Sequence, residues 1–144
     1  MVEPRRIAEV LGGRQVLRRR VASIIELSDA VAQGLPKSAL RNAVRRIFED
    51  AAEQRRMMYR IVPEATFKRR RDRLSSAESE RTERLARVIA TAEYVWEDRD
   101  SSRRFLMTPH PMLAGKAPLN AAMTELGARQ VEDLLAKILH GLPS

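Results

Sequence analysis

The sequence predicts an all-α fold in which a basic helix-turn-helix part packs with a second helical part. The helix-forming residues Ala, Leu, Arg and Glu dominate the 144 residues, and alternating strand-like patterns are scarce. Apolar residues recur at helical spacing in several segments. Charge is unevenly divided: residues 1–74 hold 18 Lys/Arg and 9 Asp/Glu, whereas residues 75–144 hold 9 and 10. We therefore expect two parts, a polyanion-binding part at 1–74 and a neutral part at 75–144.

Composition excludes several classes of protein. The chain has no cysteine, so disulfides, thiolate metal sites and a cysteine nucleophile are excluded. The two histidines, His110 and His140, are thirty residues apart, and we expect neither a metal nor a cofactor. No apolar run reaches 18 residues, and the N-terminus is charged rather than signal-like. A cytoplasmic location without membrane contact is the expectation.

The N-terminal elements follow from stop and start signals. We expect a short helix at 5–11 that stops at Gly12-Gly13, and a helix at 23–33 that stops at Gly34. Pro36 suits the first turn of a third helix. The apolar face of this third helix is Leu40, Ala43, Val44, Ile47 and Phe48. That helix either continues to Met58 or breaks near Asp50, where Asp50 and Glu53 would cap a new one.

The next helices are set by Pro63 and Ser75. A helix ends before Pro63, and a short one holding residues 66–71 follows it. Ser75 and Glu78 form an S-x-x-E capping box that opens a long helix to Trp96. The apolar stripe of this helix is expected to lie in the core, as are five methionines, which are Met57, Met58, Met107, Met112 and Met123.

The C-terminal elements are shorter and separated by proline and glycine. Residues 98–100 break the long helix, and a short helix at 101–107 follows. A stiff proline-rich connection leads to a helical turn at 118–123. The last helix is expected at 125–140, with Gly141 as its stop.

Residues 61–73 carry the first candidate site. A helix, a turn near Pro63 and a second helix rich in cations fit a helix-turn-helix, whose second helix enters the major groove of DNA. Thr66 would face a base edge or a phosphate. Cations would contact phosphates or guanines; these are Lys68, Arg69, Arg70 and Arg71. The alternative is a solvated helix end whose cations offset the helix dipole.

Two further segments are candidate binding sites, but for each of them the alternative without a function is stronger. The run Arg18-Arg19-Arg20 would brace the backbone of the same duplex, although such runs are more often solvated surface. The tail 141–144 projects from an ordered helix and would plug a partner's cleft, although most chain ends fray. No phosphate-binding glycine loop, nucleophile elbow or paired-carboxylate motif occurs, so we expect no enzyme and no small-molecule substrate.

Motifs over nearly the whole chain resemble a known family. The C-terminal ones resemble the toxin-binding region of the Xre/MbcA/ParS antitoxins; they are Phe105-Leu106, 108–113, 115–119, 124–127, Val131 and 135–141. The upstream ones resemble the Xre-type helix-turn-helix of antitoxins paired with RES-domain toxins; they are 34–36, 61–63, Thr66, Arg69-Arg70, Leu74-Ser75 and 78–81.

The resemblance implies an Xre/Cro-like helix-turn-helix and two partners. One is a RES-domain toxin, an enzyme that consumes NAD⁺, whose pocket the C-terminal end would cover. The other is operator DNA, read by a homodimer within a larger hetero-oligomer. The toxin-contacting residues would be Lys137, His140, Gly141, Leu142, Pro143 and Ser144. Leu142 would make the apolar contact, and the Ser144 carboxylate would mimic a phosphate.

Four residues depart from the family pattern. Phe105 replaces a usual tryptophan and Ala114 a common glycine, both tolerable changes. Lys137 replaces a frequent arginine and would weaken a bidentate contact to the toxin. Glu64 stands where a basic residue is common, and its carboxylate would repel phosphate.

Two other functions remain open at this stage. One is a stand-alone helix-turn-helix regulator whose C-terminal half only dimerises, and a RES-domain neighbour in the genome would argue against it. The other is a partition adaptor, which is suggested by the mixed family name alone.

Overall fold

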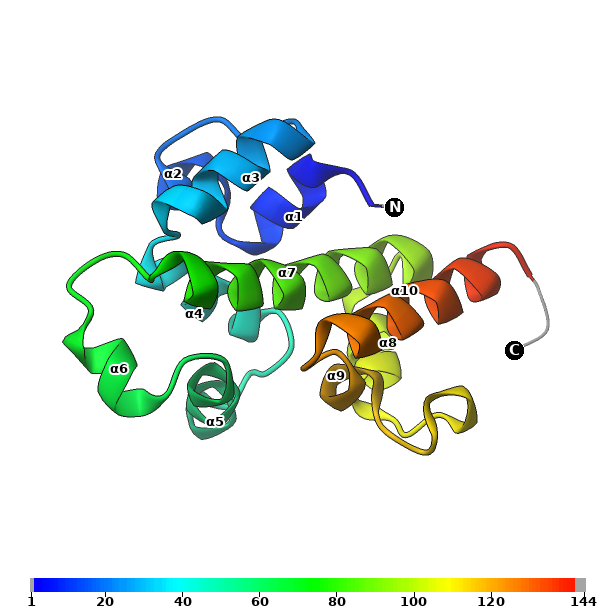
Figure 1. The fold of residues 1–144 in the computed structure, drawn as a ribbon. Helices are drawn as coiled ribbons and strands as arrows, with labels where there is room; N and C mark the ends of the chain where they lie inside the picture. Colours follow the sequence, from blue (N-terminus) through cyan, green and yellow to red (C-terminus); the bar gives the residue numbers. More distant parts are fainter. Residues whose placement is uncertain (1, 142–144) are drawn as a thin grey trace.

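A computed structural model describes residues 2–141, and within this range the all-α prediction is confirmed (Figure 1). The helices of the first half are α1 (Pro4–Val10), α2 (Gly13–Leu17), α3 (Ile24–Gln33), α4 (Lys37–Arg45), α5 (Ala51–Ile61) and α6 (Glu64–Arg69). Those of the second half are α7 (Ser76–Trp96), α8 (Arg99–Met107), the 3-10 helix η1 (Pro111–Leu113), α9 (Pro118–Ala121) and α10 (Glu125–Leu139).

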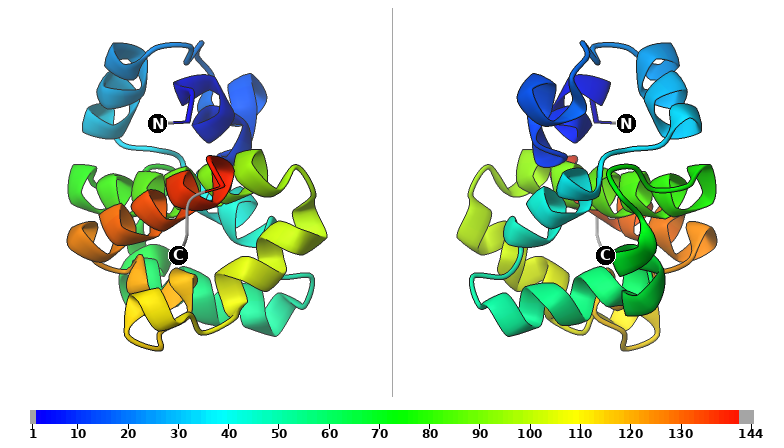
Figure 2. Two further views of the ribbon diagram at one scale, coloured as in Figure 1. Left: turned by 90° about the vertical axis from the view of Figure 1, so that its right-hand side faces the viewer. Right: turned by 90° about the vertical axis from the view of Figure 1, so that its left-hand side faces the viewer.

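Helix α7 is the axis of the molecule. It packs against α1, α3, α4, α5, α8 and α10, with α1–α3 on one side and α5, α8 and α9 on the other (Figures 1 and 2). The buried apolar side chains of the described residues form one continuous core around it. Its 21 residues span about 30 Å. Helix α6 lies near the beginning of α7, and the end of α10 lies near the end of α7 (Figure 1).

The capping box predicted at Ser75 is confirmed, and of the two alternatives at Asp50 the break is the one observed; Ser23, predicted as a helical residue, is a third cap. Asp50 accepts a hydrogen bond from the Glu53 N–H at 3.0 Å, so the chain breaks there and α5 begins. Ser75 and Glu78 form the reciprocal capping box of α7. Ser23 caps α3 by accepting from the Glu26 N–H. These caps satisfy backbone N–H groups that have no partner inside the helix.

Several boundaries differ from the prediction. Gly12 and Gly13 end α1 but also begin α2, because their positive φ angles (112° and 71°) turn the chain into a new helix. Pro36 is the N-cap of α4 rather than its first helical residue. Helix α6 ends at Arg69, so Arg70 and Arg71 follow it. Helix α8 begins at Arg99, since Asp98 caps it. The 3-10 helix at Pro111 was not predicted.

The prediction that the apolar stripe and the methionines are core is partly wrong. Met57 and Met58 are buried, but Met107 and Met112 are 48% and 46% exposed. Trp96, the last residue of the α7 stripe, is 38% exposed. Met107 lines a groove with Met57 of α5 and Leu119 of α9, whereas Trp96 packs on Phe105 of α8. None of the described helices is long and apolar enough to span a bilayer.

Candidate functional site

The turn between α5 and α6 is held by buried apolar residues. Val62 is fully buried and its N–H closes α5 on the Met58 carbonyl at 3.0 Å. Pro63 then starts α6, since it fits the N-terminal turn but not a helix interior. Phe67 turns inward from α6 and packs edge-on against Tyr59, with ring centroids 6.1 Å apart. Phe67 therefore fixes which face of α6 points outward.

Cations of α4 cover the outer side of the Phe67 ring. The Lys37 ammonium lies 4.4 Å from the ring centroid and the Arg41 guanidinium 5.2 Å from it. Lys37 also donates to the Arg70 carbonyl at 3.0 Å. Positive charge from α4 is thus added to that of α6 on one surface, a contribution that sequence reasoning missed because α4 is about thirty residues away.

The predicted DNA-contacting residues have different environments. Thr66 is half-buried, whereas Lys68, Arg69 and Arg71 are exposed. Lys68 pairs with Glu64 at 2.8 Å, and this hydrogen bond raises the pKa of Lys68. Glu64 therefore neutralises part of the charge that α6 presents; its cost to DNA affinity stays a prediction.

Arg70 has an ion-pair partner within the fold. Its Nε and Nη2 donate to the two carboxylate oxygens of Glu78 at 3.0 and 2.8 Å. Glu78 is buried and also accepts from the Ser75 N–H at 2.8 Å. The Arg70 hydrogen bond lowers the pKa of Glu78 to about 2. The sequence signal at Glu78 indicated only a helix cap, but the residue also attaches the end of α6 to the start of α7.

The segment after α6 is attached to the α3–α4 turn. The Lys37 N–H donates to the Asp72 carbonyl, and the Leu74 N–H donates to the Leu35 carbonyl, each at 2.8 Å. Gly34 is required at this turn: its φ is +99°, and an added Cβ would lie 2.4 Å from the Leu74 carbonyl oxygen. Together these contacts position α6 from both of its ends.

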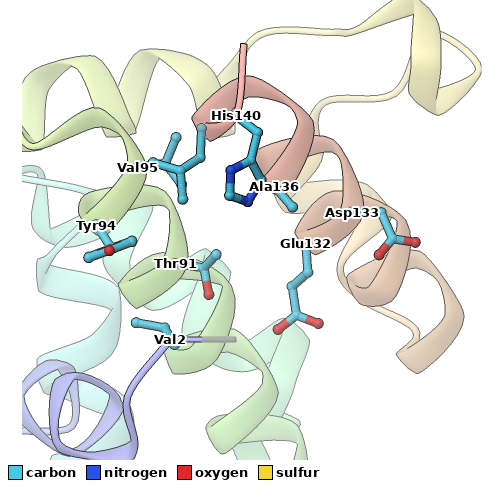
Figure 3. A pocket seen from close by; sticks show the side chains of 9 residues that line it. Val2, Thr91, Tyr94, Val95, Glu132, Asp133, Ala136 and His140 are labelled. Atoms are coloured by element: carbon cyan, nitrogen blue, oxygen red, sulfur yellow. The ribbon is translucent and has the colours of Figure 1, made fainter. Parts of the chain in front are cut away.

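The second predicted site lies at the end of α10. Lys137 is half-buried, and His140 and Gly141 are exposed. Leu142, Pro143 and Ser144 lie outside the described residues, so their predicted contacts remain predictions. His140 lies beside a hollow of about 330 Å³ between α7 and α10, which Thr91, Tyr94 and Glu132 also line (Figure 3).

Helix α10 is positioned against α7 by a group of charged side chains. Arg87 of α7 lies 2.9 Å from a Glu125 oxygen, 3.2 Å from a Glu132 oxygen and 3.8 Å from a Glu83 oxygen. Burial raises the pKa values of Glu132 and Glu83. Glu125 and Glu132 belong to α10, so these two pairs with Arg87 fix the register of α10 along α7, whereas Glu83 lies on α7 itself. In the described residues no group of acidic or histidine side chains is arranged to hold a metal.

An apolar surface lies beside this end of α10. The Trp96 ring packs 5.9 Å from the Phe105 ring, and the two line a hollow of about 360 Å³ with Ile138 and His110. Met112, two residues after His110, and Leu139, next to Ile138, are exposed as well. Exposed aromatic and methionine side chains are typical of protein-binding surfaces. Sequence reasoning missed the exposure of Trp96, because the helical spacing of α7 predicts burial.

Comparison with known proteins gives two family matches that together cover most of the chain. Residues 26–87 match the antitoxin Xre-like helix-turn-helix domain. Residues 91–141 match the antitoxin Xre/MbcA/ParS C-terminal toxin-binding domain. This chain belongs to the Xre/MbcA/ParS antitoxin family. An Antitoxin Xre of Pseudomonas putida (strain KT2440) is 34% identical over 84 residues, which are 56% of this chain and 53% of the relative. The chain thus spans about half the length of this curated relative.

Each of the two family matches contains one of the two candidate sites. The first range contains α5 and α6, and the second contains the Trp96–Phe105 surface and α10. Both matches are to antitoxin domains, in agreement with the prediction that the chain is not an enzyme. The two ranges meet within α7, whereas the predicted boundary at 74/75 precedes it. Helices α1 and α2 lie outside both ranges.

Proposed function

We propose that the chain neutralises a RES-domain toxin that consumes NAD⁺, and represses the operon that encodes both proteins. The observation that carries the proposal is the separation of two unlike surfaces along α7. A cationic surface at α6 lies at one end, and an apolar surface beside the end of α10 lies at the other (Figure 1). Such a molecule can hold DNA and a protein at the same time.

Inhibition of the toxin would be steric. A rigid helix end that enters the mouth of a cleft excludes substrate without any chemistry, so the antitoxin needs no catalytic group. The Arg87 ion pairs support this role, because they hold α10 in one position against α7. Trp96, Met112 and Leu139 would form the apolar part of the contact, while Lys137 and His140 would lie near its edge.

On the DNA side, α6 would lie in the major groove. Thr66, Arg69 and Arg71 would reach bases and phosphates, whereas Arg70 would act through Glu78 by fixing the end of α6. Two copies of a helix-turn-helix read half-sites about one helical turn apart. A homodimer on a two-fold operator is therefore part of the proposal.

The first test is NAD⁺ consumption by the protein encoded beside this chain. The full chain and a version ending at His140 are titrated into the assay, and binding is measured in parallel. We expect stoichiometric inhibition by the full chain, and binding without inhibition by the shortened one. Equal inhibition by both would place the blocking surface in α10 or in the loop at 109–118. Binding by neither would contradict the toxin proposal and favour a stand-alone DNA-binding regulator.

A further inference from the structure

The basic loop between α2 and α3 lies outside both family matches, yet it reaches the α6 end of the molecule. We propose that Arg18 and Arg19 of this loop form a second contact surface for the DNA backbone, beside the duplex segment that α6 reads. This inference rests on the proposed DNA-binding role of α6. Its consequence is a footprint on DNA that is longer than the helix-turn-helix alone provides.

Arg18 is placed next to α6 by its contact with Asp72. The Arg18 Nη1 lies 3.9 Å from a carboxylate oxygen of Asp72, three residues after the end of α6. The Asp72 carbonyl in turn accepts from the Lys37 N–H at 2.8 Å, so this point of the chain is fixed. Helix α2 and the loop after α6 both lie at the end of the molecule where α7 begins (Figure 1).

Arg19 joins the same surface through the end of α3. Its Nη1 donates to the Gln33 side-chain oxygen at 3.2 Å. The next residue along the chain, Gly34, uses its carbonyl to accept from Arg73 Nη1 at 2.7 Å. Two arginines of the α2–α3 loop therefore adjoin the turn that carries Arg73 and supports α6. Cations far apart in the sequence gather at one end of the molecule.

The Arg18 side chain is free to exchange its partner for phosphate. It is 70% exposed and Asp72 is 57% exposed, and an exposed pair at nearly 4 Å stabilises the fold little. A DNA phosphate offers the same guanidinium a stronger, charge-assisted hydrogen bond. Arg18 also has a φ of +56°, a conformation in which glycine is favoured, and its N–H is held by the Arg14 carbonyl at 2.8 Å. The turn thus presents a long cation where glycine would fit more easily.

The test compares three double variants of the full chain. Arg18→Gly/Arg19→Ala removes the proposed contacts, and glycine retains the left-handed turn. Arg99→Ala/Lys116→Ala removes the same charge from exposed residues of the second half. Arg69→Ala/Arg71→Ala removes the cations at α6. Circular dichroism verifies that each variant is folded.

Fluorescence anisotropy measures binding to two duplexes of equal length at several salt concentrations. One is the DNA directly upstream of the reading frame of this chain, and the other has a scrambled sequence. For Arg18→Gly/Arg19→Ala we expect about tenfold weaker binding to both near 0.1 M salt. The slope of log affinity against log salt should fall by about two, because two fewer counterions are released. The preference for the upstream duplex should not change, since phosphate contacts carry no sequence information.

Asp72→Asn is expected to strengthen DNA binding, the opposite of Arg18→Gly/Arg19→Ala. It frees Arg18 and removes a negative charge from the surface, so both duplexes should bind several-fold more tightly. In the Arg18→Gly/Arg19→Ala background part of this gain should disappear.

The inference is overturned if Arg18→Gly/Arg19→Ala binds both duplexes as the parent does, or if Arg99→Ala/Lys116→Ala weakens binding equally. In either case a loss of sequence preference in Arg69→Ala/Arg71→Ala would still support the role of α6. If the parent itself shows no preference for the upstream duplex and the α6 variant changes nothing, the proposed DNA-binding function fails, and the present inference fails with it.

Discussion

Glu78 links two elements with one carboxylate. It pairs with Arg70 beyond the end of α6 and caps the first turn of α7 through the Ser75 N–H. Glu78→Gln keeps a hydrogen-bond acceptor for Ser75 but removes the charge that Arg70 needs. We expect the free energy of unfolding at pH 7 to fall by about 2 kcal/mol, as for hydrogen bonds to charged groups. Urea unfolding measures it.

The pH dependence of stability tests whether the charge of Glu78 stabilises the fold. Its pKa is lowered from 4.5 to about 2 by the Arg70 hydrogen bond, so the folded state disfavours its protonation. The stabilisation is complete above about pH 4.5 and is lost as pH falls from there toward 2. Glu78→Gln should therefore approach the parent in stability near pH 2. Glu80→Gln, an exposed carboxylate two residues away, is the matched control. An equal loss in both variants at pH 7 would contradict this account.

At the scale of elements, the sequence predicted helices that have local signals. The cap at Ser75 located α7, and the one at Asp50 offered the alternative that α5 follows, because a cap depends on residues three positions apart. Helix α2 and the end of α6 were missed, because positive φ at Gly13 and the Lys37–Arg70 contact depend on tertiary structure. The Arg87–Glu125 pair joins residues 38 positions apart, so no local pattern indicates it.

The corner between α9 and α10 depends on Gly127. A Cβ at this residue would lie 1.7 Å from the Ala121 carbonyl oxygen, so the two helices would have to separate. We expect Gly127→Ala to lower the free energy of unfolding by about 2 kcal/mol or more, since backbone atoms must shift. Toxin inhibition should weaken because α10 is displaced, while DNA affinity should not change.

Gly115→Ala is the control for Gly127. Its φ is +79°, but no atom lies within 4 Å of an added Cβ. Backbone strain alone should therefore lower the free energy of unfolding of Gly115→Ala by about 1 kcal/mol. If Gly127→Ala is no more costly than Gly115→Ala, the close packing of α9 on α10 is not what holds this corner. Thermal unfolding of the three proteins, with inhibition and DNA-binding assays, decides between the two outcomes.

At the scale of the whole molecule, α7 joins the two proposed functions in one core. The cationic end near α6 and the apolar end near α10 share this helix, and the buried side chains of residues 2–141 form one continuous cluster. The charge division of the sequence predicted two parts with different tasks, and the two family matches are to two different domains. The site residues themselves were only partly predictable, because Lys37, Arg41 and Trp96 reach the two surfaces by folding rather than by sequence proximity.

This arrangement predicts that the two functions can be removed separately. Trp96→Ala should weaken toxin binding at least tenfold, because it removes the exposed aromatic side chain of the Trp96–Phe105 surface. Its operator affinity should equal that of the parent. Arg69→Ala/Arg71→Ala should show the reverse, with full inhibition of NAD⁺ consumption and weak DNA binding. Binding isotherms are measured for DNA and for the toxin with each of the two variants. If either variant loses both activities while remaining folded, the two surfaces are coupled through α7, and the molecule works as a single switch rather than as a rigid bridge between DNA and toxin.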